Sequence, residues 1–440
     1  MVQRLSKPAP EITFPTGLRL LDGWQAGNQT DRDQLRQLFN AGLSGVFDES
    51  FKVPAPADSV HVSGSIDLLT LGVLFDLYGL TAADLYKGDP QRYVRAVMTS
   101  LKLLGMPKMY LSWPVYGLTA EALGQPMIYS DRYSPGTDPE KMLVTSKNPE
   151  DWPVLDLTGE IPRLIDETLA CYRELTGFKP VLHLAAPYSL AADIYGQEHL
   201  INALTNDPAF VTRFLDHLAD AVLKPWIDHF FESHPDGWVE FSDASGSPFF
   251  IGPQNCKDVA IAATARLISE NRWPPRIYDA NYRGDWVTQA RKKAGSSRRR
   301  NTSKPSATGL SLAELFRAKN LICQDYVIRL ADDRVPAAFY VDQAINQRVP
   351  LFMGIGATEI DRHTVADLQA SRDDIIATTR GHIDAIRTVA TTIAQGGYDL
   401  LVPPWPGAVY FEDVSAESSF PLIEAIVETV RREGSLRRQS

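Results

Sequence analysis

The sequence predicts an α/β protein built as a single (β/α)8 TIM barrel with a mostly helical N-terminal cap. From about residue 107 onward, short apolar runs alternate with long amphipathic stretches, which is typical of parallel strands joined by helical crossovers. Seven such runs, and an eighth around 59–67, suit a closed barrel better than a doubly wound sheet. Neither GxGxxG nor GxxxxGK(S/T) follows a run, which disfavours the Rossmann and P-loop alternatives.

Strands and helices are expected at specific segments. The apolar runs predicted to be strands are 108–113, 180–186, 238–244, 275–281, 321–327, 350–356 and 398–404. Apolar residues at three- and four-residue steps predict helices at 160–175, 208–231, 374–394 and 421–433. Residues 1–105, with their clearest helix at 81–105, are predicted to form a cap packed on the barrel of residues 106–440. The basic, serine-rich segment 291–309 reads as a solvated or disordered insertion.

Composition excludes several functional classes. The chain has 440 residues, 44% hydrophobic and 22% charged, as in ordinary globular proteins. A formal net charge of −10 disfavours nucleic-acid binding. The three cysteines share no CxxC spacing, which argues against a disulfide framework. No signal-like segment and no apolar run near the roughly 20 residues of a membrane span are present, so we expect a cytoplasmic protein that binds no membrane.

Three predicted strands end in a carboxylate. Asp243, Asp279 and Asp325 occupy these ends and are flanked by Ser242, Asn281 and Gln324. Because the carboxyl ends of barrel strands form the active face, we expect the three aspartates to share one pocket as catalytic groups and their neighbours to bind substrate. Alternatively, each aspartate caps the helix that follows it.

Two further features are candidate binding elements. Gly354 and Gly356 follow a strand and would let backbone N–H groups bind an anion, although a tight turn explains them equally well. His183, inside a predicted strand, is either a catalytic residue or a hydrogen-bonded core histidine. His363 follows the glycine loop and presents the same choice.

Six sequence blocks, in order, resemble those of the uroporphyrinogen decarboxylase superfamily, which includes the haem-pathway decarboxylase and corrinoid-dependent methyltransferases on (β/α)8 barrels. They are 120–135, 185–215, 239–254, 321–330, 349–360 and 396–434. The decarboxylase site is poorly matched: its arginine-rich motif has no counterpart before residue 60, its catalytic aspartate falls near Val115 or Tyr116, its tyrosine at Asp193 and its late histidine near Trp405. The "AEALG" spelling at 120–124 is more similar to the methyltransferase branch.

The methyltransferase resemblance implies a zinc held by a His-x-Cys pair and a distant cysteine. Here these positions read Asp279, Asn281 and Trp405, so no metal site is expected and thiol activation is disfavoured. Relatives that methylate a nitrogen acceptor need a general acid or a hydrogen-bonding carboxylate, which the aspartate cluster would provide. The resemblance further implies no tightly bound cofactor but a corrinoid supplied by a partner protein, and a homodimer is compatible with it.

Three functions therefore compete. The first is methyl transfer between a corrinoid and a small acceptor, the second is decarboxylation of a tetrapyrrole or other polycarboxylate, and the third is a non-catalytic ligand-binding barrel. Basic anchors near strand ends would favour the decarboxylase, and the candidates are Arg132, Arg283, Arg329 and Arg362. An aromatic mouth would favour docking of a macrocycle or corrinoid protein, and its candidates are Trp113, Tyr116, Tyr282 and Trp405.

Overall fold

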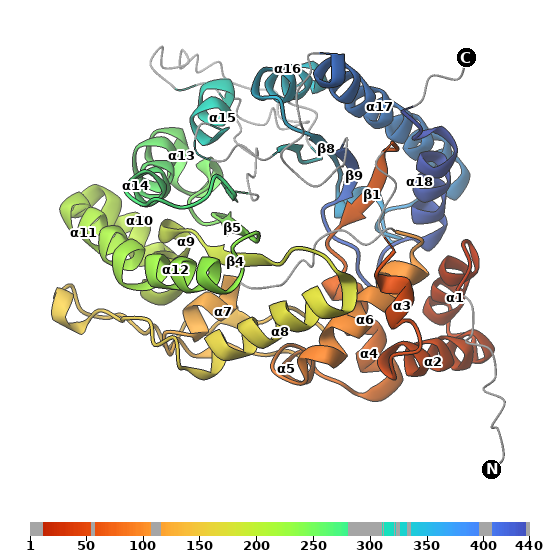
Figure 1. Ribbon diagram of the computed structural model, residues 1–440, viewed down its shortest axis with the longest axis horizontal. Helices are drawn as coiled ribbons and strands as arrows, with labels where there is room; N and C mark the ends of the chain where they lie inside the picture. Colours follow the sequence, from red (N-terminus) through yellow and green to blue (C-terminus); the bar gives the residue numbers. More distant parts are fainter. Residues whose placement is uncertain are drawn as a thin grey trace, which may run out of the picture.

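Most strands of the protein form two arcs inside a ring of helices, and the strands within each arc are parallel (Figure 1). The computed structural model describes residues 12–53, 58–106, 116–279, 310, 312–320, 322, 326–331, 336–395 and 407–436. One arc has the order β1-β9-β8-β7 and the other β4-β5-β6. The bounds are β1 His61–Gly64, β4 Val181–Ala185, β5 Trp238–Ser242, β6 Ile277–Asp279, β7 Val327–Arg329, β8 Leu351–Ile355 and β9 Gly407–Phe411; a hairpin, β2 Met127–Ile128 and β3 Gly136–Thr137, is separate. Within the described ranges no ladder joins the two arcs, so the fold shown is α/β with parallel sheets.

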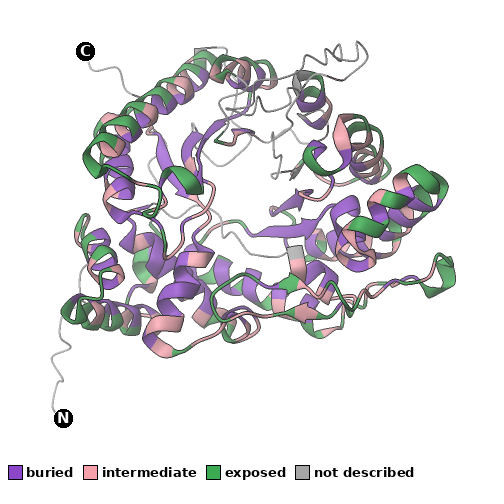
Figure 2. Ribbon diagram, turned by 180° about the vertical axis from the view of Figure 1, so that it is seen from behind, coloured by how far each residue is buried: buried purple, intermediate pink, exposed green. Residues whose placement is uncertain are grey.

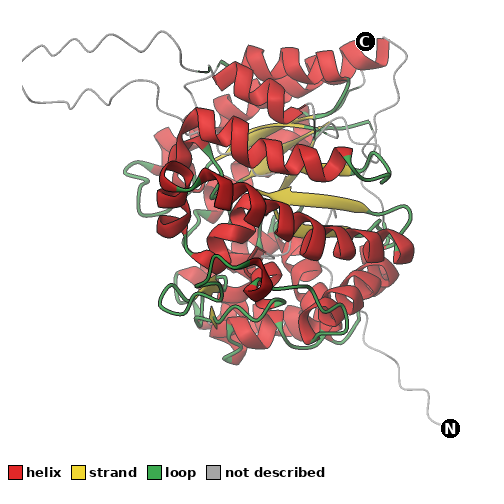
Figure 3. Ribbon diagram, turned by 90° about the vertical axis from the view of Figure 1, so that its left-hand side faces the viewer, coloured by secondary structure: helices red, strands yellow, loops and turns green. Residues whose placement is uncertain are grey.

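The helices surround the strands in side view as well (Figure 3). They are α1 Thr16–Gln25, α2 Gln29–Leu43, α3 Asp48–Phe51, α4 Asp67–Tyr78, α5 Ala82–Tyr86, α6 Pro90–Leu103, α7 Tyr116–Glu121, α8 Glu160–Thr176, α9 Pro187–Tyr195, α10 Gln197–Asn206, α11 Pro208–Leu218, α12 Lys224–Ser233, α13 Pro248–Asn255, α14 Ala262–Ser269, α15 Leu312–Asn320, α16 Ala337–Gln347, α17 Leu368–Gln395 and α18 Phe420–Glu433. Short 3-10 turns occur at Pro149–Asp151 and Ala357–Glu359, and π turns at Ala219–Leu223 and Cys256–Ile261. Among the described parts, no helix is both long and apolar enough to cross a membrane.

Most predicted elements that can be compared lie where the sequence pattern put them. Five of the predicted runs each contain one strand: β1 lies in 59–67, β4 in 180–186, β5 in 238–244, β6 in 275–281 and β8 in 350–356. β1 pairs with β9, so the sheet includes residues from the first 105, which are otherwise mostly helical. β7 begins only at the last residue of the run 321–327, and β9 was not predicted at all. The runs 108–113 and 398–404 and the insertion 291–309 lie outside the described residues.

The two faces of the arcs differ because side chains alternate along a strand. Val62, Leu184, Phe241 and Phe411 join the large core that the sheets share with the helices, and the buried strands appear purple in Figure 2. Small separate clusters lie on the other, inner face, near the start of the strands: one comprises Ile328, Phe352 and Ala408, the other Val181 and Trp238. Tyr326 packs against both clusters, so the inner faces of the two arcs meet at their N-terminal end.

Candidate functional site

Polar side chains follow the apolar layer on the inner face. His183 on β4 and Glu240 on β5 lie two residues beyond Val181 and Trp238, and the strand register pairs them directly. Their side chains are 4% and 6% exposed, and His183 Nδ1 lies 3.5 Å from Glu240 Oε2. Ser242, one of the predicted site residues, lies on the same face and is also buried. The interior of the sheets therefore becomes polar toward the carboxyl ends of the strands.

The loops that follow β1 and β9 are joined by backbone hydrogen bonds. Ser65 N–H donates to Phe411 O at 3.2 Å, Val414 N–H to Ser65 O at 2.9 Å and Leu69 N–H to Val414 O at 3.0 Å. Gly64 permits this approach, because it has φ +153° and an added Cβ would lie 2.4 Å from Phe411 O. The two loops consequently hold their acidic residues in fixed positions at the carboxyl end of the sheet.

Asp67, the first residue of α4, is one of these acids and is 4% exposed. Burial raises its pKa to about 7, and the charge of Asp413 acts in the same direction. A hydrogen bond from Tyr93 and the charge of His183 oppose the increase. Tyr93 Oη donates to Asp67 Oδ1 at 2.8 Å. Asp67 is therefore a carboxyl group that exchanges a proton near neutral pH, which is the property required of a general acid or base.

Asp413 is the second acid and lies two residues beyond β9. Burial raises its pKa to about 6, against the effect of the Val414 N–H group. Its Oδ1 atom is buried and has no hydrogen-bond partner. A buried carboxylate oxygen without a partner is costly, and carboxylates with raised pKa values are frequent at functional sites.

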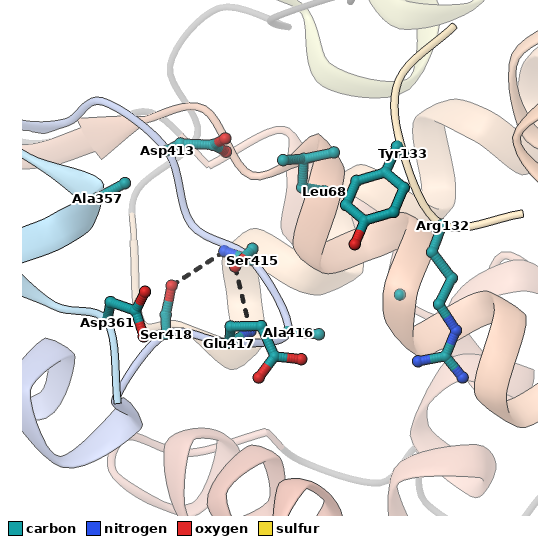
Figure 4. A pocket seen from close by; sticks show the side chains of 11 residues that line it. Leu68, Arg132, Tyr133, Ala357, Asp361, Asp413, Ser415, Ala416, Glu417 and Ser418 are labelled. Atoms are coloured by element: carbon teal, nitrogen blue, oxygen red, sulfur yellow. Dashed lines mark hydrogen bonds between the residues drawn. The ribbon is translucent and has the colours of Figure 1, made fainter. Parts of the chain in front are cut away.

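Asp413 lines a cavity of about 170 Å³ between four segments (Figure 4). The walls come from α4, the loop 130–133, the segment after β8 and the loop after β9. The lining residues are Leu68, Gly72, Arg132, Tyr133, Ala357, Asp361, Asp413, Ser415, Ala416, Glu417 and Ser418. Since Leu68 directly follows Asp67, this cavity and the buried acid belong to one region at the carboxyl end of the sheet.

Asp243 follows β5 and accepts hydrogen bonds from two neighbouring segments. Its Oδ1 accepts hydrogen bonds from Ser189 Oγ on α9 at 2.8 Å and from Gly246 N–H at 3.1 Å. These contacts attach the loop after β5 to α9, and the catalytic role of Asp243 stays a prediction. Asp193, on α9, is half-buried, and burial together with the charge of Asp243 raises its pKa to about 7.

Several predicted site residues cannot be placed. Asp279 is the last residue of β6, in register with Phe241, and Tyr116 begins α7, but the side chains of both lie outside the described part. The remaining predicted residues outside it are Trp113, Asn281, Tyr282, Arg283, Gln324, Asp325 and Trp405. The shared three-aspartate pocket therefore stays a prediction, and β7 itself ends in Arg329.

Gly354 and Gly356 make close contacts with other residues of the chain. A Cβ at Gly354 would lie 2.7 Å from Arg329 O, so this glycine allows two backbone segments to approach each other. Gly356 N–H donates to Glu359 Oε2 at 2.7 Å. These contacts are compatible with a tight turn, one of the two interpretations that the sequence leaves open, and the anion site stays a prediction.

Two of the candidate arginines, Arg132 and Arg362, already interact with carboxylates. Arg132 is hydrogen-bonded to Asp76, and its guanidinium lies 4.7 Å from the centroid of Phe75. Arg362 Nη2 lies 2.6 Å from Glu417 Oε2, which His363 Nε2 also contacts at 2.9 Å.

Arg329 lies on the helix side of the sheet. Its register partner, Met353, belongs to the core shared with the helices, and burial together with the charge of Arg329 lowers the pKa of His382 on α17. Across the described residues, no group of three or more His, Cys, Asp or Glu side chains could hold a metal ion.

Sequence reasoning missed Asp67, Tyr93, Asp413 and Glu240. A signal for Glu240 existed, because it alternates with Trp238 and Ser242 inside an otherwise apolar strand. Asp413 follows β9, which the apolar pattern does not predict, and Asp67 is the last residue of the run at 59–67. The pairing of β1 with β9 brings these two acids together, and the sequence pattern does not reveal that pairing.

Comparison with known proteins is informative at the level of the fold. No family model matches the sequence, and no curated protein matches it. The structure is similar to that of a methyltransferase from Methanosarcina mazei, with a TM-score of 0.54 and 14% sequence identity, over 90% of this chain and 98% of that chain. The protein thus has an α/β fold like that of a methyltransferase.

Proposed function

We propose that this chain is an enzyme of the uroporphyrinogen decarboxylase superfamily that moves a methyl group between a corrinoid and a small acceptor. The proposal includes a closed (β/α)8 barrel, no thiolate–zinc site, and a corrinoid supplied by a partner protein. The fold of the Methanosarcina mazei methyltransferase supports the reaction class. The observation that carries the proposal is the pair Asp67 and Asp413, held by adjoining loops at the carboxyl end of the sheet.

Residues of this chain would accept the proton that the methyl acceptor loses and would return it in the reverse direction. A bound corrinoid would supply the methyl carbon, and the electron pair of the broken carbon–cobalt bond would remain with the cobalt. The acceptor atom that gains the methyl group must lose a proton, and Asp67 in its ionised form receives it. In the reverse direction the protonated Asp67 returns that proton to the leaving group. Tyr93 orients Asp67 through the 2.8 Å hydrogen bond, and the raised pKa keeps both forms accessible near pH 7.

Decarboxylation of a polycarboxylate receives less support from the same region. Binding several carboxylates requires cationic partners, preferably arginines. Arg132 and Arg362 are already paired with carboxylates, and Arg329 lies on the helix side of the sheet. Acids with raised pKa values at the carboxyl end of the sheet would repel further carboxylates.

A corrinoid methylation assay tests the proposed function. Purified protein is mixed with methylcobalamin, or with reduced cobalamin and methylated donors, and the change in corrinoid absorption is followed. We expect turnover with at least one small partner, and a loss of about 10²–10⁴-fold in Asp67→Asn, as is typical for a lost general acid. Asp384→Asn is the control, because Asp384 is 74% exposed and lies on α17. Turnover that Asp67→Asn leaves unchanged would reject this role, and no methyl transfer with any partner would favour the binding-barrel alternative.

A further inference from the structure

The structure points to a ligand class for the cavity that Asp413 lines: we propose that it binds a small methylated ammonium ion, with Asp413 as its counter-ion. Within the proposed function, on which this inference rests, an ion that carries an N–H proton becomes the methyl acceptor once it has lost that proton, and a quaternary ion is the methyl donor in the reverse direction. The charge, the size and the walls of the cavity all favour such an ion.

The charges around the cavity do not balance. The lining side chains include three carboxylates, on Asp361, Asp413 and Glu417, and one cation, Arg132. Arg132 is neutralised by Asp76. Glu417 is neutralised by Arg362, and His363 Nε2 also contacts it. Asp361 and Asp413 therefore give the cavity its uncompensated negative charge.

Asp413 is the better ligand contact of these two. Asp361 uses Oδ1 to accept the His363 N–H group at 2.8 Å, which stabilises its own loop. Asp413 Oδ1 is buried and unpartnered, and in the described part of the chain no arginine, lysine or histidine pairs with this carboxylate. A cation in the cavity, which Asp413 lines, would interact favourably with this uncompensated carboxylate and offset the cost of its burial.

The dimensions and walls of the cavity select the cation. A cavity of about 150 Å³ in another protein holds benzene, so the about 170 Å³ here suits a molecule with a handful of heavy atoms and excludes a macrocycle. Leu68, Ala357 and Ala416 provide apolar surface for methyl groups. Tyr133 lies across the pocket from Asp413 (Figure 4), where its aromatic ring can contact a quaternary ammonium ion.

Calorimetric titration of the full-length chain tests this inference without a corrinoid. Tetramethylammonium and methylammonium chloride are the probes, tert-butanol is the neutral probe of similar size, and sodium acetate is the anionic one. We expect saturable binding of an ammonium probe and none of tert-butanol or acetate. Asp413→Asn should weaken ammonium binding at least tenfold, while Asp384→Asn should not change it.

A second pair of variants covers the case in which Asp413→Asn does not fold. Tyr133→Ala should weaken binding of tetramethylammonium, and Tyr133→Phe should retain it, because the ring and not the hydroxyl makes the contact. Absence of ammonium binding, or equal affinity in wild type and Asp413→Asn, overturns the inference. Methyl transfer to neutral acceptors without ammonium binding would leave the proposed function standing. Ammonium binding without corrinoid turnover would overturn only the methyl-transfer role.

Discussion

Glu240 lies directly across from His183 on neighbouring strands, with Oε2 3.5 Å from His183 Nδ1 and both side chains almost fully buried. Glu240 Oε2 has no hydrogen-bond partner, so the proximity of His183 is its main polar compensation in the described structure. The pair therefore separates the apolar layer at the start of the strands from the acidic region at their end.

A double-mutant cycle should reveal this coupling. We expect His183→Leu alone to cost about 3–5 kcal/mol of unfolding free energy, because it leaves a buried carboxylate unpaired. Adding Glu240→Leu should recover part of that loss, with an interaction energy of about 1–3 kcal/mol. Urea unfolding of the four proteins measures it. Strictly additive effects would show that the two side chains are energetically independent.

Asp67 should make the protein less stable as pH rises. Its pKa is raised from 3.8 to about 7 in the folded state, so between these values the folded state holds a proton that the unfolded state has released. The unfolding free energy should therefore fall by up to about 4 kcal/mol between pH 4 and 7 from this group and then level off. Asp67→Asn should flatten the profile measured by urea unfolding.

Tyr93→Phe tests the hydrogen bond that the Tyr93 hydroxyl donates to Asp67. Its hydroxyl lowers the pKa of Asp67, so its removal should raise that pKa further and extend the fall in stability to higher pH. Asp193 and Asp413 also have raised pKa values and contribute a fall of the same sign. Each single variant should therefore be compared with wild type at every pH, with Asp384→Asn as the exposed control.

The sequence predicted the strands and helices better than it predicted the site. Apolar period and length located β4, β5, β6 and β8, because burial on both faces leaves a continuous apolar run. The predicted helix at 208–231 is interrupted by a π turn at Ala219–Leu223, which the apolar spacing does not signal. The apolar pattern does not predict β9, because it places the last strand at 398–404.

The site could be predicted only in part, because it depends on long-range pairing. The rule that strand ends carry the site selected Asp243, but alternation turns the residue after Ser242 away from the inner face and toward α9. Glu240, two residues before Ser242, has the inward position. Asp67 and Asp413 are 346 positions apart, and the pairing of β1 with β9 makes them neighbours.

Asp243 should act on stability more than on turnover. Gly246→Ala should destabilise the protein by about 1–3 kcal/mol, because its Cβ would lie 2.5 Å from the Asp243 carboxylate. The same substitution should cost less in an Asp243→Ala background, where the clashing atoms are absent. Thermal unfolding measures both, and methyl transfer should survive in Asp243→Ala. A large loss of turnover with unchanged stability would instead support the predicted catalytic role.

Binding of an ammonium ion to the cavity should tighten as pH rises through about 6, because the ion requires the ionised form of Asp413 and burial places its pKa there. Asp67 and Tyr86 on neighbouring elements, together with Arg132 and Glu417 in the lining, face the same region. Of these, Asp67 has its pKa at about 7, so its ionisation should extend the increase in affinity toward pH 7.

Calorimetric titration with tetramethylammonium at pH 5 and 8 should therefore give at least a tenfold higher affinity at pH 8. Asp413→Asn should have weaker affinity at pH 8 and should retain only the smaller pH dependence that Asp67 causes. The variant Asp67→Asn should keep the increase through pH 6 and lose the extension toward pH 7. An affinity for tetramethylammonium that is the same at both pH values in wild type would show that neither carboxylate contacts the ion, and the cavity would then need another ligand.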